Sequence, residues 1–304
     1  MRVVFAGTPA VAVPSLAAVA ARHEVVGVVT RLDAPLGRKR VLTPSPVALA
    51  AAEAGLPVIK ANRLDDEVTR RITELDADLG VIVAYGGLVR EPLLSTPRRG
   101  WINLHFSLLP RWRGAAPVQW AVISGDAQSG ATVFQLVAGL DAGPVWSESS
   151  TPIGQHETAG NLLSRLAISG AEQLADAVDG IAAGRLTPTE QSGEVTLAPK
   201  LSIDDARLDF TAGLDEVYAR LRGVTPEPGA FTEIDGVRVK VLEASPARDR
   251  ARLDPGVVVA EGQHVYVGTA GSPLELVSVH PAGKKPMAAA DWWRGAGAER
   301  MVAR

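Results

Sequence analysis

Hydrophobic residues in the first half of the chain form short β-branched runs that alternate with stretches of helical period. The apolar runs are nearly continuous, which is typical of buried strands in a parallel sheet. The stretches between them carry apolar residues three or four positions apart, as expected for helices packed on the sheet. We predict strands at 3–7, 24–30, 57–61, 79–86, 101–106, 131–137 and 145–153, and helices at 14–22, 47–55, 65–78 and about 157–183.

This alternation predicts an α/β fold whose sheet is Rossmann-like, doubly wound and mostly parallel, with right-handed crossovers. A loop rich in proline and arginine is expected to run from the second strand to Pro46. We assign this first domain to residues 1–189 and a connecting linker to 190–206.

The pattern changes in residues 207–304, where period-two strands are separated by glycine turns. Turns are predicted at Asp235-Gly236 and at Gly271, because these residues sit between alternating apolar runs. Several short strands joined by such turns favour a small C-terminal OB-like β-barrel domain. Trp292 and Trp293 are expected to close the core of this barrel.

Composition narrows the class of protein. The chain has 304 residues, enough for two domains, and a net charge of −3, so no overall basic field indicates a nucleic-acid binder. It contains no cysteine, which excludes disulfides, a cysteine nucleophile and thiolate metal sites, and is compatible with a reducing, cytoplasmic location. The five histidines show no metal-ligand spacing, so we expect no metal.

The sequence favours neither a signal peptide nor a membrane-spanning segment. The apolar N-terminus resembles a signal peptide up to about residue 20, but Gly7, Pro9 and Pro14 interrupt it and a second strand follows. No run approaches the ~20 apolar residues of a membrane span. We therefore expect no contact with a membrane.

The first turn does not fit a nicotinamide enzyme. AGTP at 6–9 follows the first strand, where a dinucleotide fingerprint would need several glycines, and Thr8 and Pro9 replace them. Asp33, after the second strand, lies where the ribose-binding acid of a nicotinamide enzyme would be. Without the glycine fingerprint it is weak evidence for such an enzyme.

Polar chemistry concentrates at the end of the strand at 101–106. Asn103 and His105 are two residues apart, so both side chains can leave the same face of an extended segment. An amide and an imidazole can stabilise an oxyanion, and the imidazole can also move a proton. A buried, hydrogen-bonded histidine beside a turn asparagine explains these two residues equally well.

Asp141 favours the chemical interpretation. It lies in GLDAGPV (139–145), a glycine-rich loop between two apolar strands, where most aspartates are simply turn residues. At a sheet end, however, its carboxylate could orient the imidazole of His105. Together the three side chains would form an acyl-transfer site without a protein nucleophile.

The stretches NLHFSLLPRWRGAAPVQW (103–120) and GLDAGP (139–144) resemble the folate-dependent formyltransferases. The resemblance extends to FAGTP, PSPV, VAYG and, near the C-terminus, HPAGKKPM (280–287), which is similar to the members with a second domain that formylate methionyl initiator tRNA. It implies the formyltransferase fold, a monomer, 10-formyltetrahydrofolate as co-substrate with no permanently bound cofactor, and methionyl initiator tRNA as partner.

The resemblance also implies site residues. The catalytic positions are Asn103, His105 and Asp141. In the implied reaction an amine attacks the formyl carbon, Asn103 and protonated His105 hold the oxyanion, and Asp141 orients them and helps to move a proton. The implied folate contacts are Ser107, Leu108, Leu109 and Pro110, with Val83, Ala84, Tyr85 and Gly86 along the pterin slot.

For the tRNA, the resemblance implies Arg38, Lys39 and Arg40 in the loop before Pro46, and Lys284 and Lys285 in the second domain. By base rate, such charge runs are solvated turns. The chain departs from the family pattern at Lys39, where glycine is common, at Phe106, where a small residue is common, and at Glu227, where an aromatic is common.

Alternatives remain. A formyltransferase of this type could act on a small amine, such as glycinamide ribonucleotide or an amino sugar, but that acceptor would need neither the second domain nor the basic loop. Hydrolysis of formylfolate is another reaction of the same donor. A pure RNA-binding protein is disfavoured by the presence of Asn103, His105 and Asp141 together.

Overall fold

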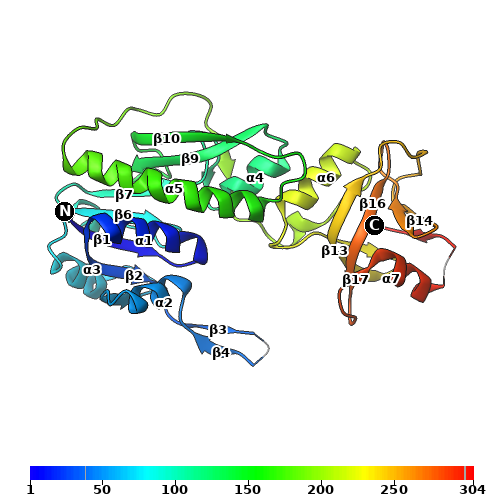
Figure 1. Cartoon of the computed structure of the whole chain (residues 1–304), viewed down its shortest axis with the longest axis horizontal. Coiled ribbons are helices and arrows are strands. Elements are labelled where there is room, and N and C mark those ends of the chain that lie inside the picture. The colour runs from blue at the N-terminus through cyan, green and yellow to red at the C-terminus, as the bar shows by residue number, and fades with distance from the viewer. Residues whose placement is uncertain (38, 298) are drawn as a thin grey trace. The chain divides into compact units, whose positions relative to one another are not determined.

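The computed structural model describes residues 1–37, 39–297 and 299–304, which divide into two compact units. Unit 1 comprises residues 1–117, 128–152 and 163–199, and unit 2 comprises residues 118–127, 153–162 and 200–304. Each unit has its own sheet and its own apolar core, and Figure 1 labels their elements.

Unit 1 is built on a seven-stranded sheet of the predicted kind. Its order is β10 (Val145–Pro152), β9 (Gln128–Gln135), β7 (Trp101–His105), β6 (Leu79–Val83), β1 (Arg2–Gly7), β2 (Glu24–Thr30) and β5 (Val58–Lys60). The five strands from β7 to β5 are parallel to one another, β9 is antiparallel to β7, and β10 is antiparallel to β9. The central strand β1 is almost fully buried, as its continuous apolar run predicts.

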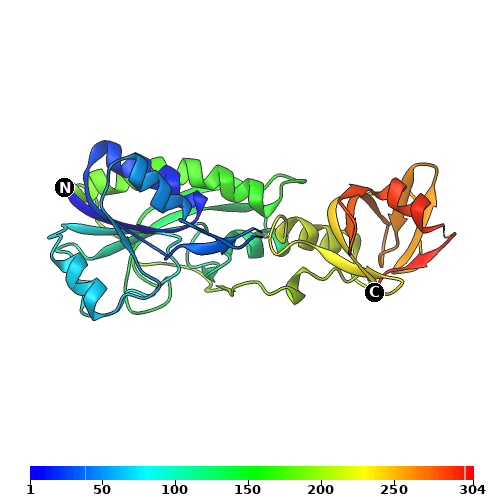
Figure 2. The same ribbon diagram turned by 90° about the horizontal axis from the view of Figure 1, so that it is seen from below.

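Helices cover both faces of this sheet, as the doubly wound prediction requires. They are α1 (Val13–Arg22), α2 (Pro46–Glu53), α3 (Asp66–Thr73) and α5 (Ala159–Ala182). In Figure 2 the cyan helix α3 lies on one side, and the blue and green helices α1, α2 and α5 lie on the other. Short 3-10 turns occur at Ala10–Ala12 and Leu93–Ser95, and β8 (Arg113–Gly114) pairs with β11 (Leu197–Ala198).

Several predicted elements need correction. The segment before Pro46 is not only a loop: it contains the antiparallel hairpin β3 (Ala34–Leu36) and β4 (Val41–Thr43), whose apolar residues are exposed and so gave no buried-strand pattern. The predicted helix at 65–78 ends at Thr73. The strand at 79–86 ends at Val83, because Ala84 takes a left-handed backbone conformation with φ of 48°.

Unit 2 contains an antiparallel sheet in the order β12 (Phe231–Ile234), β13 (Val237–Pro246), β16 (Leu274–Pro281), β15 (His264–Val267), β14 (Val257–Glu261) and β18 (Met301–Val302), with β17 (Met287–Ala288) beside β16. A bridge between Ile234 and Ala303 joins the first strand to the last. The sheet therefore closes on itself, which confirms a β-barrel-like domain.

Among the described residues, three helices were not predicted from the sequence, namely α4 (Pro117–Ile123), α6 (Leu214–Gly223) and α7 (Ala289–Ala296), besides a 3-10 turn at Asp204–Ala206. The tryptophan prediction is confirmed, since Trp292 is buried in the core of unit 2 and Trp293 packs against it. In the described ranges, no helix has the length and apolar character needed to cross a membrane.

Candidate active site

The candidate site forms where β7 ends in the middle of the unit 1 sheet. Parallel strand β6 and antiparallel strand β9 flank β7, so His105, its last residue, is enclosed and only 6% exposed. Asn103, two residues earlier, is partly exposed. Both residues line one cavity, as expected for side chains that leave the same face of a strand.

A hydrogen bond to the backbone fixes the tautomer of His105. Its Nε2 lies 2.8 Å from the carbonyl oxygen of Trp112. Because a carbonyl can only accept, Nε2 must carry the proton and donate it. The other ring nitrogen, Nδ1, lies 3.9 Å from Oδ2 of Asp141. A neutral imidazole in this position therefore presents an unprotonated Nδ1 toward the carboxylate.

Asp141 is held by both its side chain and its backbone. Its Oδ2 accepts a hydrogen bond of 2.8 Å from the N–H of Gly114. The side-chain amide of Gln191 donates to the carbonyl oxygens of Asp141 and Gly143, each at 2.8 Å. Asp141 is thus held near His105 by residues from two other segments, Gly114 and Gln191.

Burial controls the charge of His105. Removal from water lowers the pKa of this imidazole, while the Asp141 carboxylate and the hydrogen bond to Trp112 act in the opposite direction. Because burial is the largest of these influences, the pKa of His105 lies below its ordinary value, which favours the neutral imidazole. The resemblance implies a protonated His105 only while it holds the oxyanion, and it leaves the resting charge open.

The cavity at these side chains has a volume of about 780 Å³. Two loops form most of its wall, the one after β6 (84–91) and the one after β9 (136–141). Their side chains are largely apolar, and Leu88 and Leu140 remain 69% and 58% exposed. Such a wall suits a flat, partly apolar ligand whose polar groups meet Asn103, His105 and Asp141.

The backbone is strained around this cavity. Ala84, Trp112 and Asp141 have left-handed φ angles of 48°, 62° and 44°, which cost free energy in residues other than glycine. Ala84 and Asp141 line the cavity, and Trp112 supplies the carbonyl that orients His105. Three strained residues around one cavity indicate that the cavity needs these backbone segments in exact positions.

The structure brings part of the predicted folate set to the cavity. Ala84, Tyr85 and Gly86 line it, whereas Val83 is fully buried in β6. Arg31 helps to hold this segment, because its guanidinium donates to the carbonyl oxygens of Tyr85 and Gly86.

The other predicted folate contacts, Ser107, Leu108, Leu109 and Pro110, do not line the cavity. They form a turn that is largely buried against β9, where the hydroxyl of Thr132 donates to the Ser107 carbonyl and accepts from the Leu109 N–H. Their folate contacts stay a prediction.

Sequence reasoning missed most of the apolar wall and the anchoring amide. Leu88, Val89 and Leu140 have no chemical signature of their own. Their position in loops after β6 and β9, the two strands that flank β7, was the available signal, since loops often carry binding residues. Gln191 gave no signal, because it lies 50 residues from Asp141 within the segment expected to be a linker.

The predicted tRNA residues fall in both units. Arg38 lies outside the described residues. Lys39 and Arg40 are exposed in the turn between β3 and β4 of unit 1. Lys284 and Lys285 are exposed in the turn between β16 and β17 of unit 2. Both pairs are therefore accessible to a large ligand.

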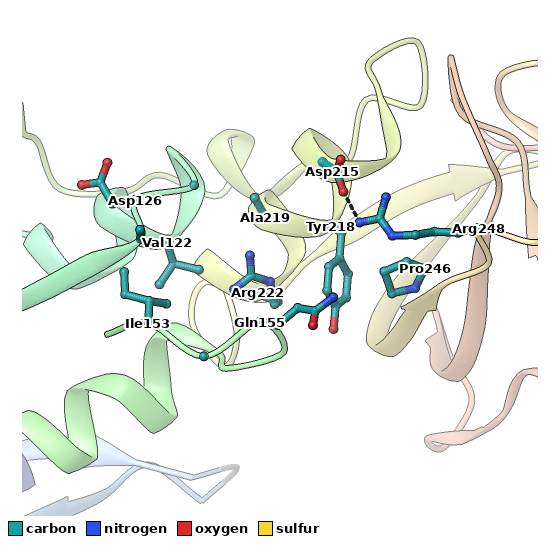
Figure 3. Close-up of a pocket in the computed structure, with 13 residues that line it drawn as sticks. Val122, Asp126, Ile153, Gln155, Asp215, Tyr218, Ala219, Arg222, Pro246 and Arg248 are labelled. Atoms are coloured by element: carbon teal, nitrogen blue, oxygen red, sulfur yellow. Dashed lines mark hydrogen bonds and ion pairs between the residues drawn. The ribbon is translucent and has the colours of Figure 1, made fainter. Parts of the chain in front are cut away.

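A second cavity, of about 280 Å³, lies within unit 2 and shares no residue with the first. Figure 3 shows Arg222 and Tyr218 of α6 near Gln155, with the ion pair of Asp215 and Arg248 beside them. The Arg222 guanidinium stacks 5.1 Å from the centre of the Tyr218 ring. The Arg222 guanidinium also donates from Nη1 to the carbonyl oxygen of Glu157, while its buried Nε has no hydrogen-bond partner among the described residues.

Comparison with known proteins gives a consistent result for both units. Residues 1–178 match the family described as Formyl transferase, and residues 200–297 match Formyl transferase, C-terminal domain. A protein named Methionyl-tRNA formyltransferase from Clavibacter sepedonicus is 61% identical over 305 residues, which cover all of both chains. One of the same name from Leifsonia xyli subsp. xyli is 63% identical over 302 residues, covering 99% of this chain and 100% of its own.

Among solved structures, the N-formyltransferase from Helicobacter canadensis, in complex with folinic acid and dTDP-3-aminofucose, superposes with a TM-score of 0.70. The match covers 91% of this chain and 98% of that one at 16% identity. At this identity the likeness supports the fold alone.

Proposed function

This chain belongs to the formyl transferase family, and on that premise we propose that it transfers the formyl group of 10-formyltetrahydrofolate to the α-amino group of methionyl initiator tRNA. The observation that carries the proposal is the convergence of Asn103, His105 and Asp141 at one cavity beside a largely apolar wall. The names of relatives that match over the full length of the chain support the acceptor.

The first step of the reaction is attack by the amine. Its nitrogen adds to the formyl carbon, and the formyl oxygen becomes an oxyanion. The amide N–H of Asn103 donates to this oxygen, which in sites of this type accelerates the reaction by about 10²–10³. Asn103 is suited to the role because it is partly exposed at the cavity while its backbone is fixed in β7.

His105 then handles the proton that the attacking amine must lose. Its Nε2–H is occupied by the Trp112 carbonyl, so Nδ1 is the nitrogen that accepts. The imidazolium that results is stabilised by Asp141, 3.9 Å away, and becomes a second donor to the oxyanion. When the C–N10 bond breaks, the proton passes to N10, which leaves formylated amine, tetrahydrofolate and neutral His105.

The folate is a co-substrate in this scheme and needs no permanent attachment. We propose that Ala84, Tyr85 and Gly86, with Leu88 and Leu140, hold its ring system, because these residues line the wall of the cavity. The folate donor and an aminoacyl-tRNA are both cytoplasmic substrates, so we propose that the protein acts in the cytoplasm. We also propose that it acts as a monomer.

The tRNA contacts are proposed for Lys39, Arg40, Lys284 and Lys285, all exposed cations on turns. Arg38 belongs to the same proposal from the sequence alone. A small amine as acceptor would use the same chemistry at Asn103, His105 and Asp141, but it would leave the whole of unit 2 without a role in substrate binding.

The test is formyl transfer from 10-formyltetrahydrofolate to methionyl initiator tRNA, methionyl elongator tRNA and glycinamide ribonucleotide. We expect transfer to the initiator tRNA and its loss in His105→Ala. Transfer only to the small amine would contradict the proposed acceptor, and full activity in His105→Ala would contradict the proposed site.

A further inference from the structure

We propose that Gln191 and Thr196 are positioning residues of the candidate active site. They belong to residues 189–198, the strap, which holds the two groups that face the ring of His105: the Trp112 carbonyl and the Asp141 carboxylate. Most of this segment falls within the predicted linker, yet it belongs to unit 1. The inference rests on the proposed function for the reaction that His105 serves.

Thr196 holds both peptide units that flank Trp112. Its hydroxyl oxygen accepts a 2.9 Å hydrogen bond from the Trp112 N–H, and its carbonyl oxygen accepts one of 2.9 Å from the Arg113 N–H. The second of these peptide units also contains the Trp112 carbonyl, to which Nε2 of His105 donates. Because a peptide unit is planar, fixing its N–H also fixes the direction of its carbonyl. The hydrogen bond that sets the tautomer of His105 is therefore oriented by the strap.

The end of the strap lies against the group that donates to the Asp141 carboxylate. Strand β11 runs parallel to β8, with Ala198 as the register partner of Gly114. A Cβ at Gly114, whose φ is 129°, would lie only 2.6 Å from the carbonyl oxygen of Ala198, so this close approach requires glycine. The N–H of Gly114 donates to Oδ2 of Asp141. The strap thus fixes the backbone from which this hydrogen bond is made.

Gln191 holds the backbone of the loop that carries Asp141. Its side-chain nitrogen donates to the carbonyl oxygens of Asp141 and Gly143, each at 2.8 Å. Its side-chain oxygen accepts from Nη2 and Nε of Arg113, at 2.6 and 3.2 Å. Because both ends of the amide are engaged, its orientation is determined, and the side chain joins the loop of Asp141 to the segment after Trp112.

The strap bonds to two residues that need support from outside. Trp112 and Asp141 have left-handed φ angles of 62° and 44°, and such conformations persist only where the surrounding structure determines them. The strap supplies hydrogen bonds to the N–H of Trp112 and to the carbonyl of Asp141. It is itself anchored at Thr189, whose backbone exchanges hydrogen bonds of 2.7 and 2.9 Å with Val145. Loss of the side-chain bonds should let both strained residues relax and loosen His105.

Hydrogen bonds rather than apolar burial hold the strap in place. Val195 and Leu197 are 51% and 62% exposed, and Ala198 is the one buried residue of the strap. Thr196 and Gln191 are instead partly buried, with their polar groups bonded to the segments beside His105. A segment that leaves apolar side chains in water and turns polar ones inward is the reverse of an ordinary core strand. This pattern supports a positioning role.

The first test is Gln191→Met, which keeps the length of the side chain but removes its donor and its acceptor. Gln135→Met is the matched control, because the Gln135 amide also donates to a carbonyl, that of Arg99, and accepts from the Trp146 ring N–H, and it does not line the cavity. Both variants should lose similar stability in urea. Only Gln191→Met should lose kcat, by about 10–10², with the KM for both substrates within about threefold of wild type.

The second test compares Thr196→Val, which keeps the shape of the side chain, with Thr196→Ser, which keeps the hydroxyl. Nitrogen NMR of the His105 ring in the free protein, at about pH 8, shows which ring nitrogen carries the proton. We expect Nε2 alone in wild type and Thr196→Ser, and a second form protonated at Nδ1 in Thr196→Val, with kcat lowered about tenfold. In Gln191→Met the pKa of His105 should fall, because the Asp141 carboxylate raises it.

Unchanged kcat and unchanged His105 signals in both Gln191→Met and Thr196→Val would overturn the proposal. Equal losses in Gln135→Met, or in Thr196→Ser, would overturn it as well, because they would show a general effect on folding or packing. A wild-type protein that formylates no aminoacyl-tRNA would refute the proposed function instead. The NMR signals of the free protein test the strap without any substrate, so the two failures can be told apart.

Discussion

Replacement of Asp141 by asparagine isolates the charge that faces His105. Asparagine keeps an oxygen that can accept the 2.8 Å hydrogen bond from Gly114, and it tolerates the left-handed backbone at φ of 44°. The change therefore removes a negative charge from a site where the side chains of Asp141 and His105 are only 13% and 7% exposed, while the local geometry is preserved.

The size of the effect follows from the separation. Two unit charges about 4 Å apart interact by about 4 kcal/mol at an effective dielectric constant of about 20. The imidazolium that forms during transfer would lose this stabilisation, and each 1.36 kcal/mol corresponds to about tenfold in rate. Because water and the asparagine dipole recover part of it, we expect kcat to fall by about 10²–10³.

The assay is single-turnover formyl transfer at saturating folate and methionyl initiator tRNA, combined with an NMR titration of His105. Loss of the carboxylate should lower the pKa of His105 further, since Asp141 raises it in the native protein. Asp76→Asn is the control, because Asp76 is an exposed aspartate of unit 1 with a φ of 45° and lies outside the cavity. A kcat within about threefold of wild type in Asp141→Asn would refute this reasoning.

Further predictions concern stability, measured by urea unfolding. Gly80→Ala would place a Cβ 2.1 Å from the buried Trp101 ring and should lower the free energy of unfolding by about 3 kcal/mol, whereas Gly295→Ala, with open space around it in α7, should be neutral or stabilise by up to about 1 kcal/mol. Ser45→Ala removes a buried N-cap of α2 that also bonds a threonine hydroxyl, and should cost about 2 kcal/mol. Burial depresses the pKa of His105, so the unfolded chain binds a proton first as the pH falls below about 6.5, and stability should drop more steeply from pH 7 to pH 5 in wild type than in His105→Gln.

The elements with a strong local pattern were predictable from the sequence. β2 (Glu24–Thr30) matches its predicted bounds, because a continuous β-branched run between polar ends has few alternatives. The β3–β4 hairpin escaped prediction because Leu36 and Leu42 are exposed, so no burial pattern marks it. Helix α6 escaped prediction because its N-cap, Gly213, offers no side chain to mark the start of the helix.

The candidate site also contains features that the sequence predicts and features that only the tertiary structure reveals. Asn103 and His105 could be placed together because both belong to one strand. The position of Asp141 could not be derived from strand ends, because β9 is antiparallel to β7 and its last residue, Gln135, pairs with Ile102 near the start of β7. The contacts that decide their chemistry depend on tertiary structure. The Trp112 carbonyl that fixes the tautomer of His105 lies beyond a turn whose path no local pattern predicts.

The central claim is that this cavity moves a formyl group onto the methionine of an initiator tRNA. The most direct test is rapid-quench transfer of labelled formyl from 10-formyltetrahydrofolate, with wild type compared with Asn103→Ala and His105→Ala. The account predicts label on the methionine amino group in one fast turnover, slowed by about 10²–10³ in Asn103→Ala and at least as much in His105→Ala. Fast transfer by both variants, or label that never reaches the amino group, would contradict it.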